Sequence, residues 1–285
     1  MSGVALGGNK VRKLEYLLAD AKAKGCDTII TTGAAQSNHA TITAACCKRL
    51  RLDVILVLKQ RGVTEKKGNL LLDDLMGVKV VFVDSDHDDE VFTEIERISD
   101  ELRVAGKKPY FIPVGASVPL GSIGYVDCIK EMMEQAAAQD VKIDHIVCCA
   151  GSGGTHAGVV LGAKLFGNGA KVTGIIVAPK EDFQGQVLEI ANGACEILET
   201  ELRLTRGDIV MEDYVGPGYS KPSEQGNAAI RLMAENEGIF LDPVYTGKTF
   251  AGLLDLCAKG YFSDDEAIVF LHSGGVASLF AIPMD

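Results

Sequence analysis

Residues 27–39, DTIITTGAAQSNH, read as a buried β-strand that ends at a glycine and passes through a polar turn into a helix. β-Branched and apolar residues fill positions 27–32, and the alanine-rich helix that follows is expected to reach Leu50. Further strands and helices are expected in alternation, at 53–58, 65–76, 78–83, 88–104 and 109–112. Short apolar strands alternating with amphipathic helices predict a parallel sheet covered on both faces, the arrangement of an α/β fold.

The alternation of helices and strands begins before residue 27 and continues after a junction near residue 120. Apolar residues from Val11 to Ala21 recur at three- and four-residue spacing, which predicts a helix before the first strand. Glycine and proline gather in 115–124, GASVPLGSIG, and predict a domain junction. The alternation then restarts, with elements expected at 123–139, 145–149, 155–166, 172–177, 184–191, 223–237, 248–258 and 267–271.

The charge of the chain limits its partners. With 285 residues, of which 47% are hydrophobic, it can bury a large core. The net charge of −11 and the pI near 5.0 argue against nucleic acid and against anionic membranes, because no basic surplus is available to neutralise phosphates. A small-molecule substrate is the expectation.

Cysteine usage and apolar runs indicate the compartment. The eight cysteines occur singly or as neighbours and never as CxxC, so we expect buried thiols in a reducing environment and no metal site. The acidic run 84–90 lacks the glycine of a calcium loop and is interpreted as a solvated turn. No apolar run reaches membrane-spanning length and no signal peptide is evident, which predicts a cytoplasmic protein.

A lysine follows two glycines and an asparagine in 7–15, GGNKVRKLE. Lys10 is expected in the first turn of a helix, where the electropositive helix end and loss of water lower the pKa of an ammonium group. A lysine with a lowered pKa is a nucleophile or forms a Schiff base. Taken alone, this motif favours an ordinary solvated lysine in the first turn of a helix.

A glycine-rich loop follows a strand in 148–158, CCAGSGGTHAG. From Gly151 to Thr155, backbone N–H groups and the hydroxyls of Ser152 and Thr155 can surround an anion at a helix N-terminus. A dinucleotide fingerprint would require glycine where His156 stands, so one phosphate fits better than a pyrophosphate. A purely structural turn, or a nucleotide-binding oxidoreductase, is the alternative for this loop.

Other polar residues stand at turns. The segment 36–39, QSNH, offers donors for a carboxylate at a helix start, although Ser37 or Asn38 alone is more often a helix cap than a ligand. Ser273 precedes two glycines that permit close approach of a flat ring. Tyr219 and Tyr245 could face a cleft or be structural. A Schiff-base lysine, a monophosphate cup and a ring contact together match the needs of pyridoxal phosphate.

These motifs resemble one family of pyridoxal-phosphate enzymes, namely the D-cysteine desulfhydrase and 1-aminocyclopropane-1-carboxylate deaminase group of the tryptophan-synthase-β fold (fold type II). The matching segments, in the family's order, are GGNKVRKLE, GAAQSNH, GSGGTHAG, PGY, DPVYTGK and HSGG. The resemblance implies two three-layer α/β domains with mostly parallel sheets. Residues 7–120 would form the smaller domain, and residues 1–6 with 121–285 the larger.

The resemblance also implies roles for individual residues. Lys10 would hold the cofactor as a Schiff base and shuttle the α-proton of the substrate. The remaining cofactor contacts would be Asn38 to the ring hydroxyl, Lys13 as countercharge to the phosphate, Ser273 to the pyridine nitrogen, and Gly151, Ser152, Gly153, Gly154 and Thr155 around the phosphate. Gln36 and Ser37, next to Asn38, would hold the substrate carboxylate, and Tyr219 and Tyr245 would line the substrate pocket.

Two positions bear on the substrate. Deaminases of the family look to have glutamate after the tyrosine of DPVY, and this chain has Thr246 there. Desulfhydrases look to have a hydroxyl residue before the paired glycines of the late strand, and this chain has Ser273 there. A neutral hydroxyl gives a weaker electron sink, which suffices when thiolate leaves. This favours β-elimination from D-cysteine to pyruvate, ammonia and sulfide, with 1-aminocyclopropane-1-carboxylate deamination and cysteate sulfo-lyase activity as alternatives.

The resemblance also carries one departure and one expectation about assembly. Family members look to have several dozen more residues before GGNK, so the N-terminal segment reads as truncated, and a catalytically inactive homologue is a further alternative. Relatives are commonly homodimers, and a homodimer is expected here.

Overall fold

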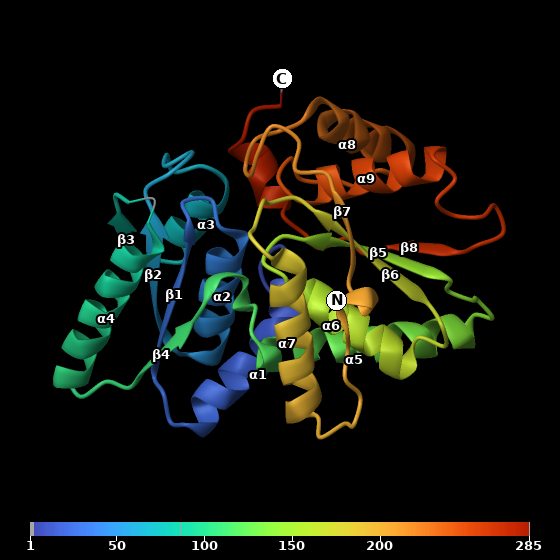
Figure 1. Cartoon of the computed structure of the whole chain (residues 1–285). Coiled ribbons are helices and arrows are strands. Elements are labelled where there is room, and N and C mark those ends of the chain that lie inside the picture. Colours follow the sequence, from blue (N-terminus) through green and yellow to red (C-terminus); the bar gives the residue numbers. More distant parts are fainter. Residues whose placement is uncertain (1–2, 86, 285) are drawn as a thin grey trace. The chain divides into compact units, whose positions relative to one another are not determined.

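The computed structural model describes residues 3–85 and 87–284. The chain divides into two compact units. Unit 1 comprises Met1–Ala116 and Ala277–Ile282, and unit 2 comprises Ser117–Val276 and Pro283–Asp285. Each unit holds one four-stranded sheet with helices beside it (Figure 1).

Unit 1 alternates helices and strands, as the sequence predicts. Its elements are α1 (Lys10–Ala23), β1 (Thr28–Ala34), α2 (Asn38–Leu50), β2 (Asp53–Lys59), α3 (Gly68–Leu75), β3 (Lys79–Val83), α4 (Asp88–Val104), β4 (Pro109–Ile112) and the 3₁₀ turn η1 (Val114–Ala116). The strand order is β3-β2-β1-β4, and every pairing is parallel. Ile30, Ile55 and Val57 of the sheet pack against Val91, Ile95 and Ile98 of α4. The face of α1 from Val11 to Ala21 is buried, as its spacing predicts.

Unit 2 repeats this architecture. Its elements are α5 (Pro119–Ala138), β5 (His145–Ala150), α6 (Gly154–Phe166), β6 (Lys171–Ile176), α7 (Phe183–Ile197), η2 (Arg206–Asp208), β7 (Val210–Asp213), α8 (Glu224–Glu237), α9 (Thr246–Ala258) and β8 (Ile268–Phe270). The 3₁₀ turn η3 (Val276–Phe280), next along the chain, belongs to unit 1 from Ala277 onward. The strand order is β7-β6-β5-β8, again all parallel. Helices α8 and α9 cover one face of this sheet, and α5, α6 and α7 lie on the other (Figure 1).

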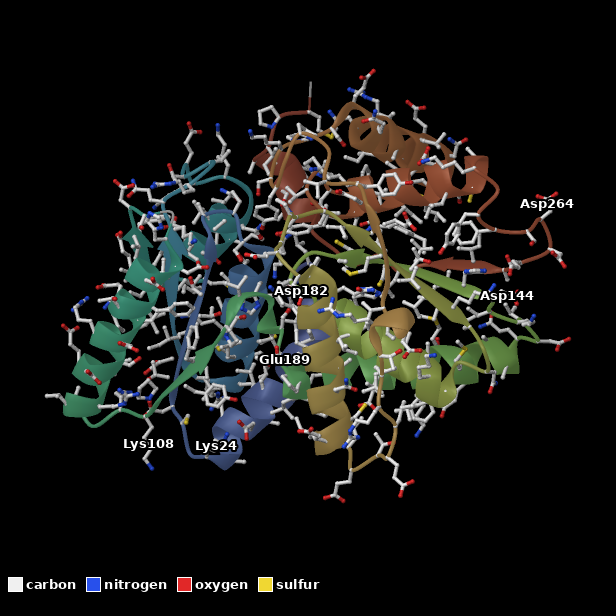
Figure 2. The ribbon with its side chains drawn as sticks, in the orientation of Figure 1. Lys24, Lys108, Asp144, Asp182, Glu189 and Asp264 are labelled. Atoms are coloured by element: carbon white, nitrogen blue, oxygen red, sulfur yellow. The ribbon has the colours of Figure 1, made fainter. Side chains whose placement is uncertain are left out.

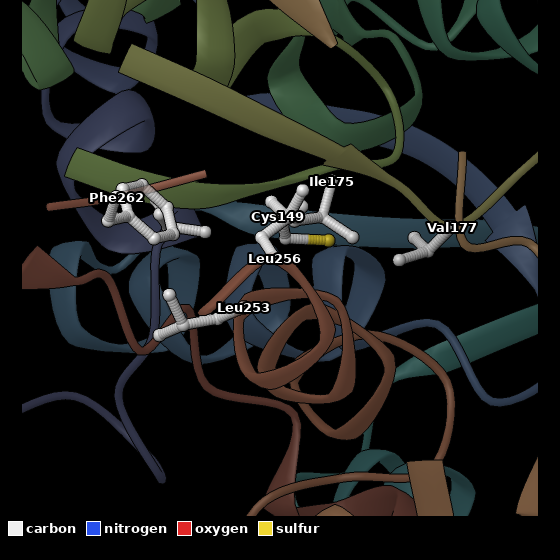
Figure 3. Close-up of a cluster of buried hydrophobic side chains, with 7 residues drawn as sticks. Cys149, Ile175, Val177, Leu253, Leu256 and Phe262 are labelled. Carbon is white, nitrogen blue, oxygen red and sulfur yellow. The ribbon is translucent and has the colours of Figure 1, made fainter. Parts of the chain in front are cut away.

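The core between the sheet of unit 2 and α9 is apolar. Val147, Cys149, Ile175 and Val177 of the sheet contact Leu253 and Leu256 of α9, with Phe262 at the end of the cluster (Figure 3). The free thiol of Cys149 is part of this packing, as expected for a buried cysteine. Two three-layer units with parallel sheets confirm the predicted fold class.

The predicted bounds of α4 and β4 are matched, and three expectations about elements are wrong. Helix α5 begins at Pro119, four residues before its expected start at Ile123, because proline fits the first turn of a helix. The two units divide after Ala116, within the glycine- and proline-bearing stretch. Helix α7 extends six residues beyond its expected end at Ala191, to Ile197. Strand β7 was not predicted, since four residues with two carboxylates give little strand signal.

Charged side chains lie at the surface of each unit. In Figure 2, Lys24, at the end of α1, and Lys108, just before β4, project away from the sheet of unit 1. No helix in the described part of the chain combines the length and the apolar character needed to cross a membrane.

Candidate active site

Lys10 is the first residue of α1, as the sequence predicts. Its Nζ donates a hydrogen bond to Oδ1 of Asn9 at 3.0 Å, and the side chain is half-buried. Gly7 and Gly8 precede it with φ angles of 72° and 110°, a backbone region that favours glycine. The glycine pair therefore turns the chain sharply into the helix, and it places the amine at the electropositive end of α1.

Lys13 lies close to the same histidine as Lys10. The pKa of His39 is well below its usual range because the ring is buried and because the charges of Lys10 and Lys13 disfavour a second cation nearby. The hydroxyl of Thr31 donates its proton to the carbonyl of Ile112 at 2.7 Å. In its 2.8 Å contact with Nε2 of His39 the same hydroxyl must therefore be the acceptor. The ring is thus neutral and carries its proton on Nε2, while both lysines give this end of unit 1 a positive potential.

The turn after β1 is fixed by Ser37. Its Oγ accepts a hydrogen bond from the N–H of Ala40 at 3.2 Å, so Ser37 is the N-cap of α2 and Asn38 is the first helical residue. A Cβ at Gly33 would lie 2.4 Å from this hydroxyl, which explains the glycine at that position. The hydroxyl of Ser37 is therefore used as a cap here, and its predicted role in holding a substrate carboxylate stays a prediction.

The side chain of Gln36 is occupied by the segment that leads into α3. Its Nε2 donates to the carbonyls of Val63 and Lys67, each at 3.1 Å, and its Oε1 accepts from the N–H of Asn69 at 2.9 Å. All strong hydrogen-bonding positions of this amide except one lone pair are thereby used. In this arrangement the donors left for a carboxylate are the N–H groups in the first turn of α2.

In unit 2 the glycine-rich loop joins β5 to α6, as predicted. Gly153 is the N-cap of α6 with φ of 93°, and a Cβ there would lie 3.2 Å from Phe183 and Val187. Ser117 closes the loop, because its Oγ accepts from the N–H of Gly154 at 3.2 Å and donates to Oγ of Ser152 at 2.7 Å. A loop in which Gly153 and Gly154 leave little room for a Cβ, with hydroxyls at a helix N-terminus, fits a phosphate group.

His156, which replaces the third glycine of a dinucleotide fingerprint, is fully buried. A Cβ at Gly174 of β6 would lie 2.5 Å from its ring, so the imidazole fills the space between α6 and the sheet. Burial lowers its pKa to about 4, and it is neutral at physiological pH. Neither ring nitrogen has a hydrogen-bond partner among the described residues. The residue therefore has a packing role, which agrees with the preference of the loop for one phosphate.

Tyr219 and Tyr245 lie together in unit 2. Their hydroxyls are 2.6 Å apart, and their rings meet edge to face with centroids 6.1 Å apart. Burial is the main cause that holds the pKa of Tyr245 well above its usual range, and the neighbouring phenol adds to it. This hydroxyl therefore stays protonated. The ring of Tyr245 also lies near the phosphate cradle, because a Cβ at Gly151 would be 3.5 Å from it. The cradle and the tyrosine pair thus share one end of the sheet.

Sequence reasoning missed Asp242, which shapes this end of unit 2. The carboxylate is fully buried and accepts the N–H groups of Val244, Tyr245 and Thr246, at 2.8–2.9 Å. It also accepts the hydroxyl of Thr246 at 2.8 Å, and that hydroxyl accepts the N–H of Asp242 at 2.7 Å. The aspartate of DPVYTGK is a helix-capping signal that could have been recognised.

Lys248 was also missed, and it anchors the loop that carries Tyr219. Its ammonium donates to the carbonyls of Val215 at 2.7 Å and Gly218 at 2.8 Å, and the side chain is 1% exposed. Burial lowers its pKa, while the charge of Asp242 acts in the opposite direction. The lysine thereby links α9, which begins directly after Tyr245, to the residue before Tyr219.

Replacing Lys248 by methionine is expected to loosen this loop. Both carbonyls lose their donor, at a cost of about 1–3 kcal/mol for each buried unsatisfied group. Hydrogen–deuterium exchange at the amides of Val215 and Lys221 should then accelerate by roughly 10-fold. Lys221→Met, in the same loop but exposed, is the control. Unchanged exchange in Lys248→Met would show that the lysine does not anchor the loop.

Ser273 follows β8 and is 9% exposed. The neighbouring His272 holds the turn, since its Nδ1 accepts the N–H of Gly274 at 3.1 Å and its Nε2 donates to the carbonyl of Phe240 at 2.9 Å. Gly274 and Gly275 have φ angles of 89° and 102°. Strand β8 pairs with β5, so Ser273 and the phosphate cradle both follow the carboxyl ends of neighbouring parallel strands, where α/β proteins bind ligands.

Known proteins similar to this chain include pyridoxal-phosphate-dependent enzymes. The family model described as "Pyridoxal-phosphate dependent enzyme" matches residues 3–274. A D-cysteine desulfhydrase from Yersinia enterocolitica is 42% identical over 98% of this chain and 85% of its own length. A 1-aminocyclopropane-1-carboxylate deaminase from Bradyrhizobium diazoefficiens is 39% identical over the same shares.

A solved structure shows the same fold. The crystal structure of an "ACC deaminase homologue" superimposes with a TM-score of 0.89, at 42% identity, over 98% of this chain and 83% of the other. The predicted family and cofactor are therefore confirmed. This chain belongs to the pyridoxal-phosphate-dependent enzymes, as a lyase of the group that contains D-cysteine desulfhydrase and 1-aminocyclopropane-1-carboxylate deaminase.

Proposed function

We propose that this enzyme catalyses β-elimination from D-cysteine, giving pyruvate, ammonia and hydrogen sulfide. The observation that carries the proposal is the state of Thr246, whose buried hydroxyl both donates to and accepts from Asp242. Where the deaminases of the family look to offer a carboxylate to the pyridine nitrogen, this chain has a hydroxyl already in use. Ser273 is then the residue we assign to that nitrogen.

A neutral partner at the pyridine nitrogen suits a reaction with a good leaving group. When bound, pyridoxal phosphate acts as an electron sink for the negative charge that develops at the substrate α-carbon. A hydroxyl does not keep the nitrogen protonated as a carboxylate does, so this sink is weaker. Thiolate departs readily from the β-carbon, and a weaker sink is then sufficient.

The residues of the chain have the following roles in this proposal. Lys10 removes the proton from the substrate α-carbon with its Nζ, which is the general-base step. The Cβ–S bond breaks with its electron pair going to sulfur, and water then converts the three-carbon product to pyruvate and ammonia. Overall, D-cysteine and one water give pyruvate, ammonia and hydrogen sulfide.

Binding and orientation fall to the other site residues. The cradle from Gly151 to Thr155, with Lys13 as countercharge, holds the cofactor phosphate, and Asn38 holds the ring hydroxyl. Donors in the turn from Gln36 to Asn38 bind the substrate carboxylate at the start of α2. The protonated hydroxyls of Tyr219 and Tyr245 orient the thiol side of the substrate.

A product assay tests the substrate assignment. The purified enzyme is expected to form pyruvate and sulfide from D-cysteine, with much lower turnover of cysteate and of 1-aminocyclopropane-1-carboxylate. Formation of 2-oxobutanoate from the cyclopropane substrate, without sulfide from D-cysteine, would contradict the role given to Thr246 and Ser273. Cofactor binding without turnover of any of the three would instead support an inactive homologue. We further propose a homodimer, on the family resemblance, and a cytoplasmic location, on the sequence pattern. Light scattering of the purified protein tests the assembly.

A further inference from the structure

Asn69 is a buried asparagine that no step above uses. It is the second residue of α3 and is 2% exposed. Its Nδ2 donates to Oδ1 of Asn38 at 2.7 Å and to the carbonyl of Gln36 at 3.1 Å, while its own N–H donates to Oε1 of Gln36. Asn69 therefore contacts two neighbouring residues of the turn between β1 and α2, although it lies more than thirty positions away in the sequence.

The hydrogen bonds around Asn69 fix which end of each amide is nitrogen. The carbonyl of Gln36 can only accept, so the atom of Asn69 that contacts it must be Nδ2. The same Nδ2 faces Asn38, so the atom of Asn38 in that contact must be the oxygen. A flip of either amide would set two acceptors or two donors against each other. The orientation of Asn38 thus follows from a main-chain group.

This orientation leaves the amide nitrogen of Asn38 available. Its Nδ2 donates to no residue in 3–85 or 87–284 of the structure, whereas its oxygen is occupied by Asn69. The Asn38 amide consequently presents two N–H donors and no carbonyl to a ligand bound at the start of α2. A donor is the group that a ring hydroxyl oxygen requires when it is ionised.

We propose that Asn69 is a positioning residue that holds the Asn38 amide with its N–H groups toward the ring hydroxyl of the cofactor. The proposal rests on the role assigned to Asn38 above. Without Asn69, the amide of Asn38 is free to rotate, and in half of its orientations a carbonyl faces the ring oxygen. The resulting loss of binding affinity is expected only for cofactors that carry the ring oxygen.

Cofactor binding to the full-length apoenzyme tests the proposal with two cofactors. Pyridoxal phosphate and 3-deoxypyridoxal phosphate, which lacks the ring hydroxyl, are titrated against wild type, Asn69→Ala and Asn38→Ala by equilibrium dialysis. Asn69→Ala keeps the main-chain N–H that binds Gln36, so the turn retains that contact. Asn236→Ala, an exposed asparagine on α8, is the control.

The expected result is a cofactor-specific loss. Asn69→Ala should weaken binding of pyridoxal phosphate by about 2-fold, because about half of the Asn38 orientations remain competent, and should leave binding of 3-deoxypyridoxal phosphate unchanged. Asn38→Ala should show the same selectivity. If Asn69→Ala weakens the binding of both cofactors equally, Asn69 has only a structural role and the proposal is overturned. The proposal is also overturned if Asn69→Ala weakens the binding of neither cofactor. If Asn38→Ala does not discriminate, the role of Asn38 itself is wrong. None of these readings depends on D-cysteine being the substrate.

Discussion

Replacing Lys10 by alanine is expected to remove the visible absorbance of the bound cofactor and to lower kcat for elimination by at least about 10²–10⁴-fold, the contribution of a positioned general base. The amine at the start of α1 is the group that we assign to covalent attachment and to removal of the α-proton. Its half-buried position beside Asn9 and behind two glycines in the left-handed region supports that assignment. Absorbance spectra and initial rates measure both effects.

Lys24→Ala is the matched control for Lys10→Ala. Lys24 stands at the other end of the same helix, is exposed, and forms an i,i+4 ion pair with Asp20. Loss of an exposed ion pair costs at most about 1 kcal/mol and should leave the spectrum and the rate unchanged. A Lys10→Ala protein that keeps the visible band and turns over D-cysteine would show that another lysine carries the cofactor.

The Asp73→Asn substitution is expected to stabilise the fold at pH 8, with an effect that disappears on acidification. Asp73 lies one turn after Asn69 on α3 and is 1% exposed, and neither carboxylate oxygen has a hydrogen-bond partner among the described residues. Burial raises its pKa from 3.8 to about 7, and the nearby Thr41 hydroxyl offsets only part of this because it makes no well-formed hydrogen bond. Above neutral pH the fold therefore holds a buried carboxylate that no partner neutralises.

The sign of the pH dependence follows from the raised pKa. Between about pH 4 and pH 7 the folded state binds this proton and the unfolded state does not, so the stabilising contribution is full below pH 4 and is lost as the pH rises to 7. A rise from 3.8 to about 7 corresponds to at most about 4 kcal/mol. Asparagine resembles the protonated acid and should recover on the order of 1–4 kcal/mol at pH 8.

Urea unfolding at pH 5, 6, 7 and 8 measures this difference. The gap in free energy of unfolding between Asp73→Asn and wild type should widen with pH and level off above pH 7. Asp74→Asn is the control, because Asp74 is exposed and paired with Lys66. A gap that does not change with pH, or a variant less stable than wild type at pH 8, would show that Asp73 is not a buried charge in the native state.

The sequence predicted the parts of the site in which the main chain itself is unusual. Gly8, Gly153 and Gly274 all have positive φ angles, and such backbone can be recognised from glycine beside a polar residue at the end of a strand or the start of a helix. Alternating apolar strands and amphipathic helices predicted the two parallel sheets for a similar reason, since local periodicity determines burial.

The partners of these residues could not be predicted. Gln36 is predicted to hold a substrate carboxylate, and no local pattern indicates the carbonyls at Val63 and Lys67 that its side chain binds. Lys248 reads as an ordinary helical lysine until the carbonyls of the Tyr219 loop are seen around it. Both contacts join residues about thirty positions apart, and only the folded chain specifies such pairs. Strand β7 is not predicted from the sequence because it is short and lies at the edge of its sheet, where polar residues are tolerated.

The absorption spectrum of the purified enzyme, recorded before and after D-cysteine is added, is the decisive measurement for cofactor attachment to Lys10 and for elimination from D-cysteine. We expect a visible band from the lysine-bound cofactor. The band should change on addition of D-cysteine while pyruvate and sulfide accumulate in equal amounts, and it should return when the substrate is consumed. Absence of a visible band with added pyridoxal phosphate would contradict the role of Lys10, and a band that D-cysteine does not perturb would contradict D-cysteine as the substrate.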